Sequence, residues 1–132
     1  GMYVANQVIN LMTKKNIPIA NSKILIMGLT FKENCPDIRN TRVIDLIKEF
    51  KSVNCKVDVY DPWINKEESI AEYGFKPIDF PFNDKYDGIV LAVGHDEFKS
   101  FSLEKIKSFG KGNHVIYDVK YLLRVNESDG RL

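Results

Sequence analysis

Apolar residues recur along this chain at two spacings, and each spacing predicts one kind of element. Between Tyr3 and Lys15 they recur at three and four residues, which predicts a helix that stops before Pro18. Ser102 is a suitable N-cap for a later helix that ends near Phe109. Helices are therefore expected over residues 3–15, 41–52, 66–73 and 102–109.

Alternating and continuous apolar runs predict the strands between these helices. Residues 56–60 alternate in polarity, whereas residues 89–93 are continuously apolar, as in a strand covered on both faces. Strands are expected over residues 23–27, 56–60, 74–78, 87–93 and 114–119. Strands alternating with helices predict an α/β fold with a Rossmann-like, doubly wound, mainly parallel sheet.

The helix at 3–15 precedes the first strand, and the alternating pattern does not require it. We therefore interpret residues 1–20 as a linker or helix that belongs with something outside the domain, and residues 21–132 as the α/β domain. Ligands in doubly wound folds bind at the carboxyl ends of the strands. We expect the loop at 28–39 and the segment Gly94–Glu97 to border that edge.

Composition excludes several classes of function. The 132 residues carry a net charge of only +1, which gives no general reason to expect nucleic acid or a membrane surface as a partner. Cys35 and Cys55 form no CxxC pair and have no histidine at metal-ligand spacing, so no metal site is predicted. Two such cysteines without a signal peptide indicate reduced thiols in a cytoplasm.

The loop after the first strand holds the main candidate chemistry. A dinucleotide cradle needs GxGxxG at this point, and only Gly28 is present, so this domain is not expected to bind NAD alone. Lys32, Arg39 and Arg42 gather around the loop, and Phe31 offers a flat surface for a base or sugar. The cluster is either an anion site or a solvated basic loop neutralised by nearby acids.

Asp61, His95 and Cys35 each have a structural and a functional interpretation. Asp61 ends a strand where an acid can hold an adenosine ribose, but Asp-Pro is also a common turn. His95 follows a buried strand, where ligand-facing groups lie, or is a capping or surface histidine. Cys35 has no nearby histidine, which favours an inert thiol over a nucleophile. We predict no catalytic residue in this chain.

The stretch from Gly28 to Thr41 fits the pattern G-L-x-F-K-x-x-x-x-D-x-R-x-S/T at every fixed position. It resembles the start of the C-terminal domain of the UDP-glucose/GDP-mannose dehydrogenase family. Residues 57–62, 86–95, 117–120 and 129–132 resemble later parts of the same domain. The helix at 3–15 is similar to the segment that leaves the family's central helical domain.

This resemblance implies that the chain holds the nucleotide part of a UDP-sugar, whose C6 alcohol the full enzyme oxidises to a carboxylate with two NAD. It further implies that Phe31 and Lys32 contact the UDP-sugar, that Lys120 lies near a further basic contact, and that Arg39 reaches NAD. NAD would be held mainly by an N-terminal domain that, like the catalytic cysteine, lies outside this chain. The fragment alone is expected to be inactive, and the full-length enzyme is expected to be a homodimer.

The residues from Lys32 to Asn40 look most similar to bacterial family members that act on UDP-N-acetylhexosamines in surface polysaccharide synthesis. Two other hypotheses remain open. The chain is a stand-alone nucleotide-binding or regulatory module, or it is a dimerisation module that works through the helix at 3–15 and Trp63.

Overall fold

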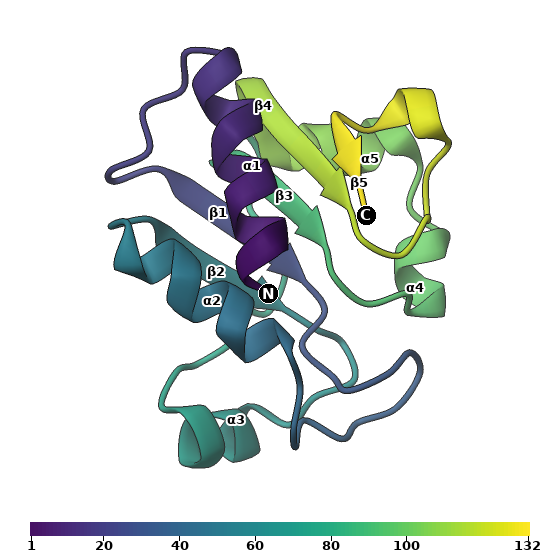
Figure 1. Cartoon of the computed structure of the whole chain (residues 1–132). Helices are drawn as coiled ribbons and strands as arrows, with labels where there is room; N and C mark the ends of the chain where they lie inside the picture. The colour runs from purple at the N-terminus through teal and green to yellow at the C-terminus, as the bar shows by residue number, and fades with distance from the viewer.

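The computed structural model describes all residues from 1 to 132, in helices packed on one sheet (Figure 1). The helices are α1 (Met2–Lys14), α2 (Val43–Ser52), α3 (Lys66–Tyr73), α4 (Asp96–Lys99) and α5 (Leu103–Phe109), with a 3-10 turn at Val125–Glu127. The strands are β1 (Lys23–Met27), β2 (Lys56–Tyr60), β3 (Tyr86–Leu91), β4 (Gly110–Asp118) and β5 (Gly130–Arg131).

The five strands form one parallel sheet in the order β2-β1-β3-β4-β5, which confirms the predicted α/β, Rossmann-like class. From β1 the chain moves outward to β2, and it then returns to the other side of β1 to add β3, β4 and β5. The direction of winding therefore reverses between β1 and β3. Ligands of doubly wound folds bind outside the carboxyl ends of the strands at such a point.

The sheet is covered on both faces, so its central strands are buried throughout. One face carries Ile24, Ile26 and Val90 and is covered by α1 and α2. The opposite face carries Leu25 and Ile89 in a second core, with side chains from α4 and α5. Neighbouring residues of one strand thus enter opposite cores, which explains the continuous apolar runs in the sequence.

Helix α1 packs into the same core as the sheet. Val4, Ala5, Val8 and Met12 are buried along its inner face. The helix lies directly against β3, since a Cβ added at Gly88 would be in ordinary contact with Met12 Sδ and Val8 Cγ1, both at 3.6 Å. The helix that the alternating pattern did not require therefore supplies one wall of the core.

The predicted strand at 74–78 is wrong, although Ile78 does donate one backbone hydrogen bond to Val59 O at 2.9 Å. Pro77 has no N–H to extend a ladder, and the segment stays irregular. The sequence pattern also missed α4 and the two-residue β5, and β4 begins at Gly110 instead of His114. Elements this short carry no readable period.

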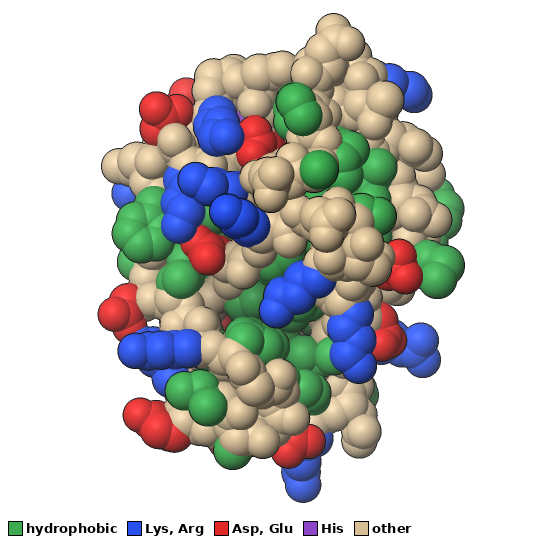
Figure 2. Space-filling view, turned by 90° about the vertical axis from the view of Figure 1, so that its left-hand side faces the viewer, with side chains coloured by type: hydrophobic (Ala, Val, Ile, Leu, Met, Phe, Trp, Pro, Cys, Tyr) green, Lys and Arg blue, Asp and Glu red, His purple; other side chains and the backbone are tan.

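The surface shows no dominant charge on the face seen in Figure 2. Lys and Arg side chains lie there among Asp, Glu and apolar groups without covering it. None of the helices combines the length and apolar character that crossing a bilayer requires. No group of three or more His, Cys, Asp and Glu side chains is arranged to hold a metal ion.

Buried tyrosines should make the fold sensitive to alkali. Burial, helped by the hydrogen bond that Tyr86 donates to Asp58 Oδ2 at 2.7 Å, raises the pKa of Tyr86 above its ordinary value of 10.0. Burial also raises the pKa of Tyr60 and of Tyr117. The unfolded chain therefore loses these protons first, and the free energy of unfolding should fall as the pH rises above about 10.

Urea unfolding at about pH 8 and 10.5 measures this fall in the free energy of unfolding, and Tyr86→Phe should make the fall smaller. An equal decline in both proteins would contradict the raised pKa of Tyr86.

Candidate functional site

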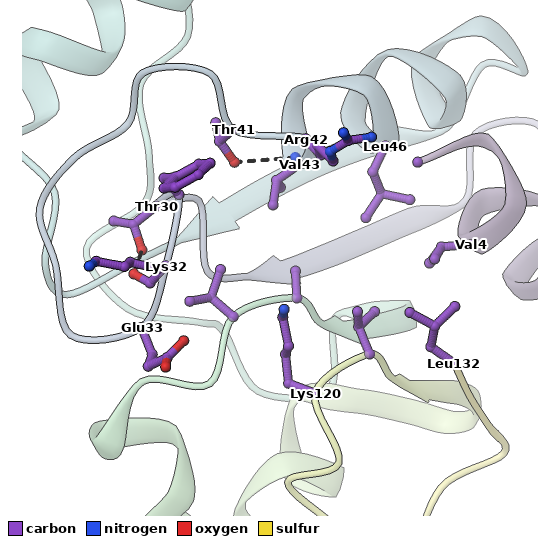
Figure 3. Close-up of a pocket in the computed structure, with 15 residues that line it drawn as sticks. Val4, Thr30, Lys32, Glu33, Thr41, Arg42, Val43, Leu46, Lys120 and Leu132 are labelled. Carbon is purple, nitrogen blue, oxygen red and sulfur yellow. Dashed lines mark hydrogen bonds between the residues drawn. The ribbon is translucent and has the colours of Figure 1, made fainter.

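A cavity of about 390 Å³ opens at the reversal point of the sheet, between the loop after β1, the start of α2 and the segment after β4 (Figure 3). Its size is within the range of small-molecule sites. It is lined by Gly1, Val4, Thr30, Phe31, Lys32, Glu33, Thr41, Arg42, Val43, Leu46, Ala92, Val93, Val119, Lys120 and Leu132. The polar groups come from the loop after β1, from the start of α2 and, in Lys120, from the segment after β4, and the apolar groups come mostly from the strand ends and helices.

Three cations surround this cavity, and none of them forms an ion pair within the chain: Lys32, Arg42 and Lys120. Lys120 points into the cavity from the end of β4, and Arg42 lies on the opposite side at the start of α2 (Figure 3). Glu33 is the one acidic side chain of the lining. The cavity therefore has a local excess of positive charge in a chain that is nearly neutral, which favours an anionic ligand.

Internal hydrogen bonds hold the loop in place without further glycines. Thr30 Oγ1 donates to Lys32 O at 2.9 Å, and Phe31 N donates to Asp37 O at 2.8 Å. Ile38 is buried in the core and anchors the far end of the loop. Phe31 itself is 61% exposed at the rim of the cavity, so its ring is free to contact a ligand.

A buried carboxylate fixes the turn that carries Lys120. Asp118 Oδ1 accepts from Leu122 N at 3.1 Å, and Asp118 Oδ2 accepts from Leu123 N at 2.8 Å. The chain therefore reverses directly after β4. Lys120 lies within this turn, where its ammonium faces the loop after β1 across the cavity (Figure 3).

Asp61 occupies the backbone amides that a dinucleotide cradle would offer to a phosphate. Its side chain is fully buried, and Oδ2 accepts from Leu29 N at 2.7 Å and from Thr30 N at 3.2 Å. Oδ1 accepts from Trp63 N at 2.8 Å, which is the expected Asp-Pro turn. The turn interpretation is correct, and the carboxylate also caps the amides after Gly28. With its oxygens engaged in this way, Asp61 does not present a ribose contact.

His95 is fully buried beside Asp61, so it is neither a surface histidine nor part of the cavity lining. Nδ1 accepts from Asn34 N at 2.9 Å. The ring is therefore the neutral tautomer with its proton on Nε2, which lies 2.9 Å from Asp61 Oδ2 and 3.2 Å from Thr30 Oγ1. Although His95 is the N-cap residue of α4, its side chain makes no capping bond. It links two loops instead.

Arg39 lies outside the cavity lining, with its side chain 76% exposed. Its Nε donates to Asp37 Oδ1 at 3.1 Å, and this hydrogen bond lowers the pKa of Asp37. The structure therefore brings Phe31, Lys32 and Lys120 together and leaves Arg39 apart. Its assignment as a cofactor contact stays a prediction. Cys35 and Cys55 are both free thiols, and burial raises the pKa of Cys55.

The sequence did not reveal two parts of the lining. Thr41 is buried with its hydroxyl accepting from Val43 N at 3.2 Å, and it looked only like the last fixed position of the loop motif. Leu132 joins the cavity because β5 pairs with β4 and brings the end of the chain back. No local signal in a polar tail could have predicted that return.

Comparisons with known proteins agree on one relationship. The family model described as "UDP-glucose/GDP-mannose dehydrogenase family, UDP binding domain" matches residues 25–125. UDP-N-acetyl-D-glucosamine 6-dehydrogenases of Pseudomonas aeruginosa and Salmonella typhi are 49% and 52% identical to this chain over all 132 residues. The chain spans 31% of the length of each of these relatives.

Solved structures share the fold. An NDP-N-acetyl-D-galactosaminuronic acid dehydrogenase from Methanosarcina mazei superposes with a TM-score of 0.82 at 22% identity, over 95% of this chain and 26% of that one. A UDP-D-ManNAc dehydrogenase from Pyrococcus horikoshii gives 0.77 at 23% identity, over 92% of this chain and 27% of that one. At these identities the likeness establishes the fold alone.

Proposed function

This chain belongs to the UDP-glucose/GDP-mannose dehydrogenase family, and we propose that it is the C-terminal, UDP-sugar-binding domain of an NAD-dependent nucleotide-sugar 6-dehydrogenase. The observation that carries the proposal is the cavity in which Lys32, Arg42 and Lys120 have no acidic partner. Three unpaired cations beside an exposed Phe31 suit a nucleoside diphosphate better than a neutral ligand.

Each group has a role that follows from its chemistry. Lys32 and Lys120 line the cavity, and their ammonium groups can serve as point charges for the diphosphate, whereas the planar guanidinium of Arg42 suits two phosphate oxygens at once. Phe31 offers its ring to the nucleoside or the sugar, and Val43, Val93 and neighbouring apolar side chains form the cavity wall. The chain's part in the reaction is thus to bind and orient the UDP-sugar, and we assign it no catalytic residue.

The groups after β1 do not fit a dinucleotide, because Asp61 already takes the amides of Leu29 and Thr30. We therefore propose that NAD binds mainly to a part of the longer protein outside this chain. In that protein NAD would accept the hydride as the C6 alcohol is oxidised. The exposed position of Arg39 supports its proposed contact with NAD from this side.

The names of the relatives support a more specific substrate. Two relatives that match at about half identity over the whole chain are UDP-N-acetyl-D-glucosamine 6-dehydrogenases. We therefore propose a UDP-N-acetylhexosamine as the substrate, used for bacterial surface polysaccharide, and a homodimeric parent enzyme. The two free cysteines support a reducing cytoplasm as its compartment.

Lys32→Ala should weaken the binding of UDP to this chain by about 10- to 100-fold, since a charge-assisted hydrogen bond to phosphate is lost. Isothermal titration calorimetry of the wild-type and variant chains measures the change. Lys48→Ala is the matched control, because Lys48 is also an exposed lysine, lies on α2 and does not line the cavity.

Two further titrations test whether the diphosphate is the part recognised. Uridine without phosphates should bind far more weakly than UDP, and added salt should weaken UDP binding. The proposal fails if Lys32→Ala and Lys48→Ala bind UDP with the same affinity, or if uridine and UDP bind equally well.

A further inference from the structure

We propose that His95, backed by Asp61, is a positioning residue that holds Phe31 and Lys32 in the geometry that binds the UDP-sugar. The proposal rests on the function proposed above and adds two residues that do not touch the ligand. Both are fully buried, and neither lines the cavity. Their hydrogen bonds connect the loop after β1 to the ends of two other strands.

The loop is held at two points, one on each side of its ligand-facing residues. On the near side, Leu29 N and Thr30 N donate to Asp61 Oδ2, and Thr30 Oγ1 lies 3.2 Å from His95 Nε2. On the far side, Asn34 N donates to His95 Nδ1 at 2.9 Å. Residues 31–33, which are exposed and line the cavity, lie between these two anchors.

Asn34 is held by more than its backbone. Its Oδ1 accepts from Asp96 N at 3.0 Å, so the residue forms hydrogen bonds both to His95 and to the first turn of α4. Its φ of 54° is in the left-handed region, which asparagine tolerates better than most residues. The chain therefore turns back at Asn34, where one acceptor, His95 Nδ1, and one donor, Asp96 N, meet the residue.

Packing around the ring keeps it in one orientation. Trp63 stacks on His95 with centroids 6.0 Å apart, and Phe98 meets its edge at 5.3 Å. Trp63 is itself fixed by the hydrogen bond that its Nε1 donates to Glu97 Oε1 at 2.9 Å. An apolar side chain at position 95 could fill the same space, but it would offer the loop no hydrogen bond. The hydrogen bonds to the loop, and not packing alone, thus explain why a polar ring stands at position 95.

The test separates the position of the loop from the stability of the fold. His95→Leu removes both ring nitrogens, whereas His95→Asn keeps an acceptor near the place of Nδ1. Phe109→Leu is the structural control, because Phe109 is buried in the same core as Phe98 and its ring packs on Phe80 and Phe101 and not on His95. Each variant is measured by urea unfolding, by calorimetric titration with UDP and by hydrogen exchange of the amides of residues 29–34.

We expect His95→Leu to raise the Kd for UDP about tenfold and to speed exchange at Asn34, while most of the chain stays folded. His95→Asn should recover most of the affinity, and Phe109→Leu should leave the Kd unchanged at a similar loss of stability. The proposal is overturned if His95→Leu binds UDP within about twofold of wild type, or if Phe109→Leu weakens binding equally.

The experiments distinguish a failure of the proposed UDP-sugar binding from a failure of the positioning role of His95. A wild-type chain that does not bind UDP counts against the proposed function, and hydrogen exchange then decides the positioning role by itself. Faster exchange at Asn34 in His95→Leu, without faster exchange in the sheet, supports the role. Unchanged exchange at Asn34 overturns it.

Discussion

Removal of residues 1–16 is expected to abolish cooperative folding of this chain. Val4, Val8 and Met12 of α1 are all at most 8% exposed and belong to the core on one face of the sheet. Burial of such side chains stabilises a fold by about 1.5–3 kcal/mol each, so the helix contributes roughly 5–9 kcal/mol. A whole domain is stable by only about 5–15 kcal/mol.

The loss would extend beyond the helix itself. The sheet face beneath α1 and α2 carries Ile24, Val90 and Val115, which are fully buried in the intact chain. Truncation also removes Lys15, which donates to His114 O at 2.6 Å and pairs with Asp129 next to β5. The exposed apolar face should cause the truncated chain to aggregate.

Far-UV circular dichroism and thermal unfolding of the truncated chain measure this effect. Two point variants provide matched controls on the same helix. Met12→Ala should lower the free energy of unfolding by about 2–5 kcal/mol, whereas Asn10→Ala, at an exposed position, should change it by less than about 0.5 kcal/mol. A truncated chain that unfolds cooperatively at the wild-type temperature would show that α1 is an appended helix.

The two central strands of this fold were predictable because each is an apolar run of strand length. Residues 23–27 form β1, and the run at 89–93 lies at the end of β3 and just beyond it; these two strands are neighbours inside the sheet. The segment at 74–78 misled because its apolar residues pack against the core without forming a ladder. The pairing of β5 was unpredictable, since two residues carry no pattern and their partner strand is distant in sequence.

The site residues that lie together in one loop could be predicted from the sequence. Those that are brought together only by tertiary contacts could not. Phe31 and Lys32 follow from the motif, and the structure brings them to the same cavity as Lys120. The link between Asp61 and His95 joins residues 34 positions apart, and neither of the two interpretations of each residue included a contact with the other. Only the parallel sheet, which gathers the carboxyl ends of its strands, brings the two side chains together.

The same contacts explain why one glycine remains after β1. In a dinucleotide cradle, glycines let the backbone approach a phosphate. Gly28 instead has a φ of 105°, and a Cβ added there would lie 2.5 Å from Val93 Cβ and 2.9 Å from Val93 N. The residue is needed where the end of β1 crosses close to the chain after β3, whether or not a nucleotide is bound.

Gly28→Ala should therefore lower the free energy of unfolding by about 2–6 kcal/mol, as left-handed strain and overpacking each cost about 1–3 kcal/mol. Urea unfolding of three glycine variants separates these two costs. Gly74→Ala carries the strain alone, because Gly74 has a φ of 79° and nothing within 4 Å of the added Cβ. Gly112→Ala carries neither cost, because its added Cβ also meets nothing within 4 Å and its φ is not in the left-handed region.

The expected order of destabilisation, from largest to smallest, is Gly28→Ala, Gly74→Ala and then Gly112→Ala. If Gly28→Ala costs no more than Gly74→Ala, the close approach of Val93 is not what requires the glycine.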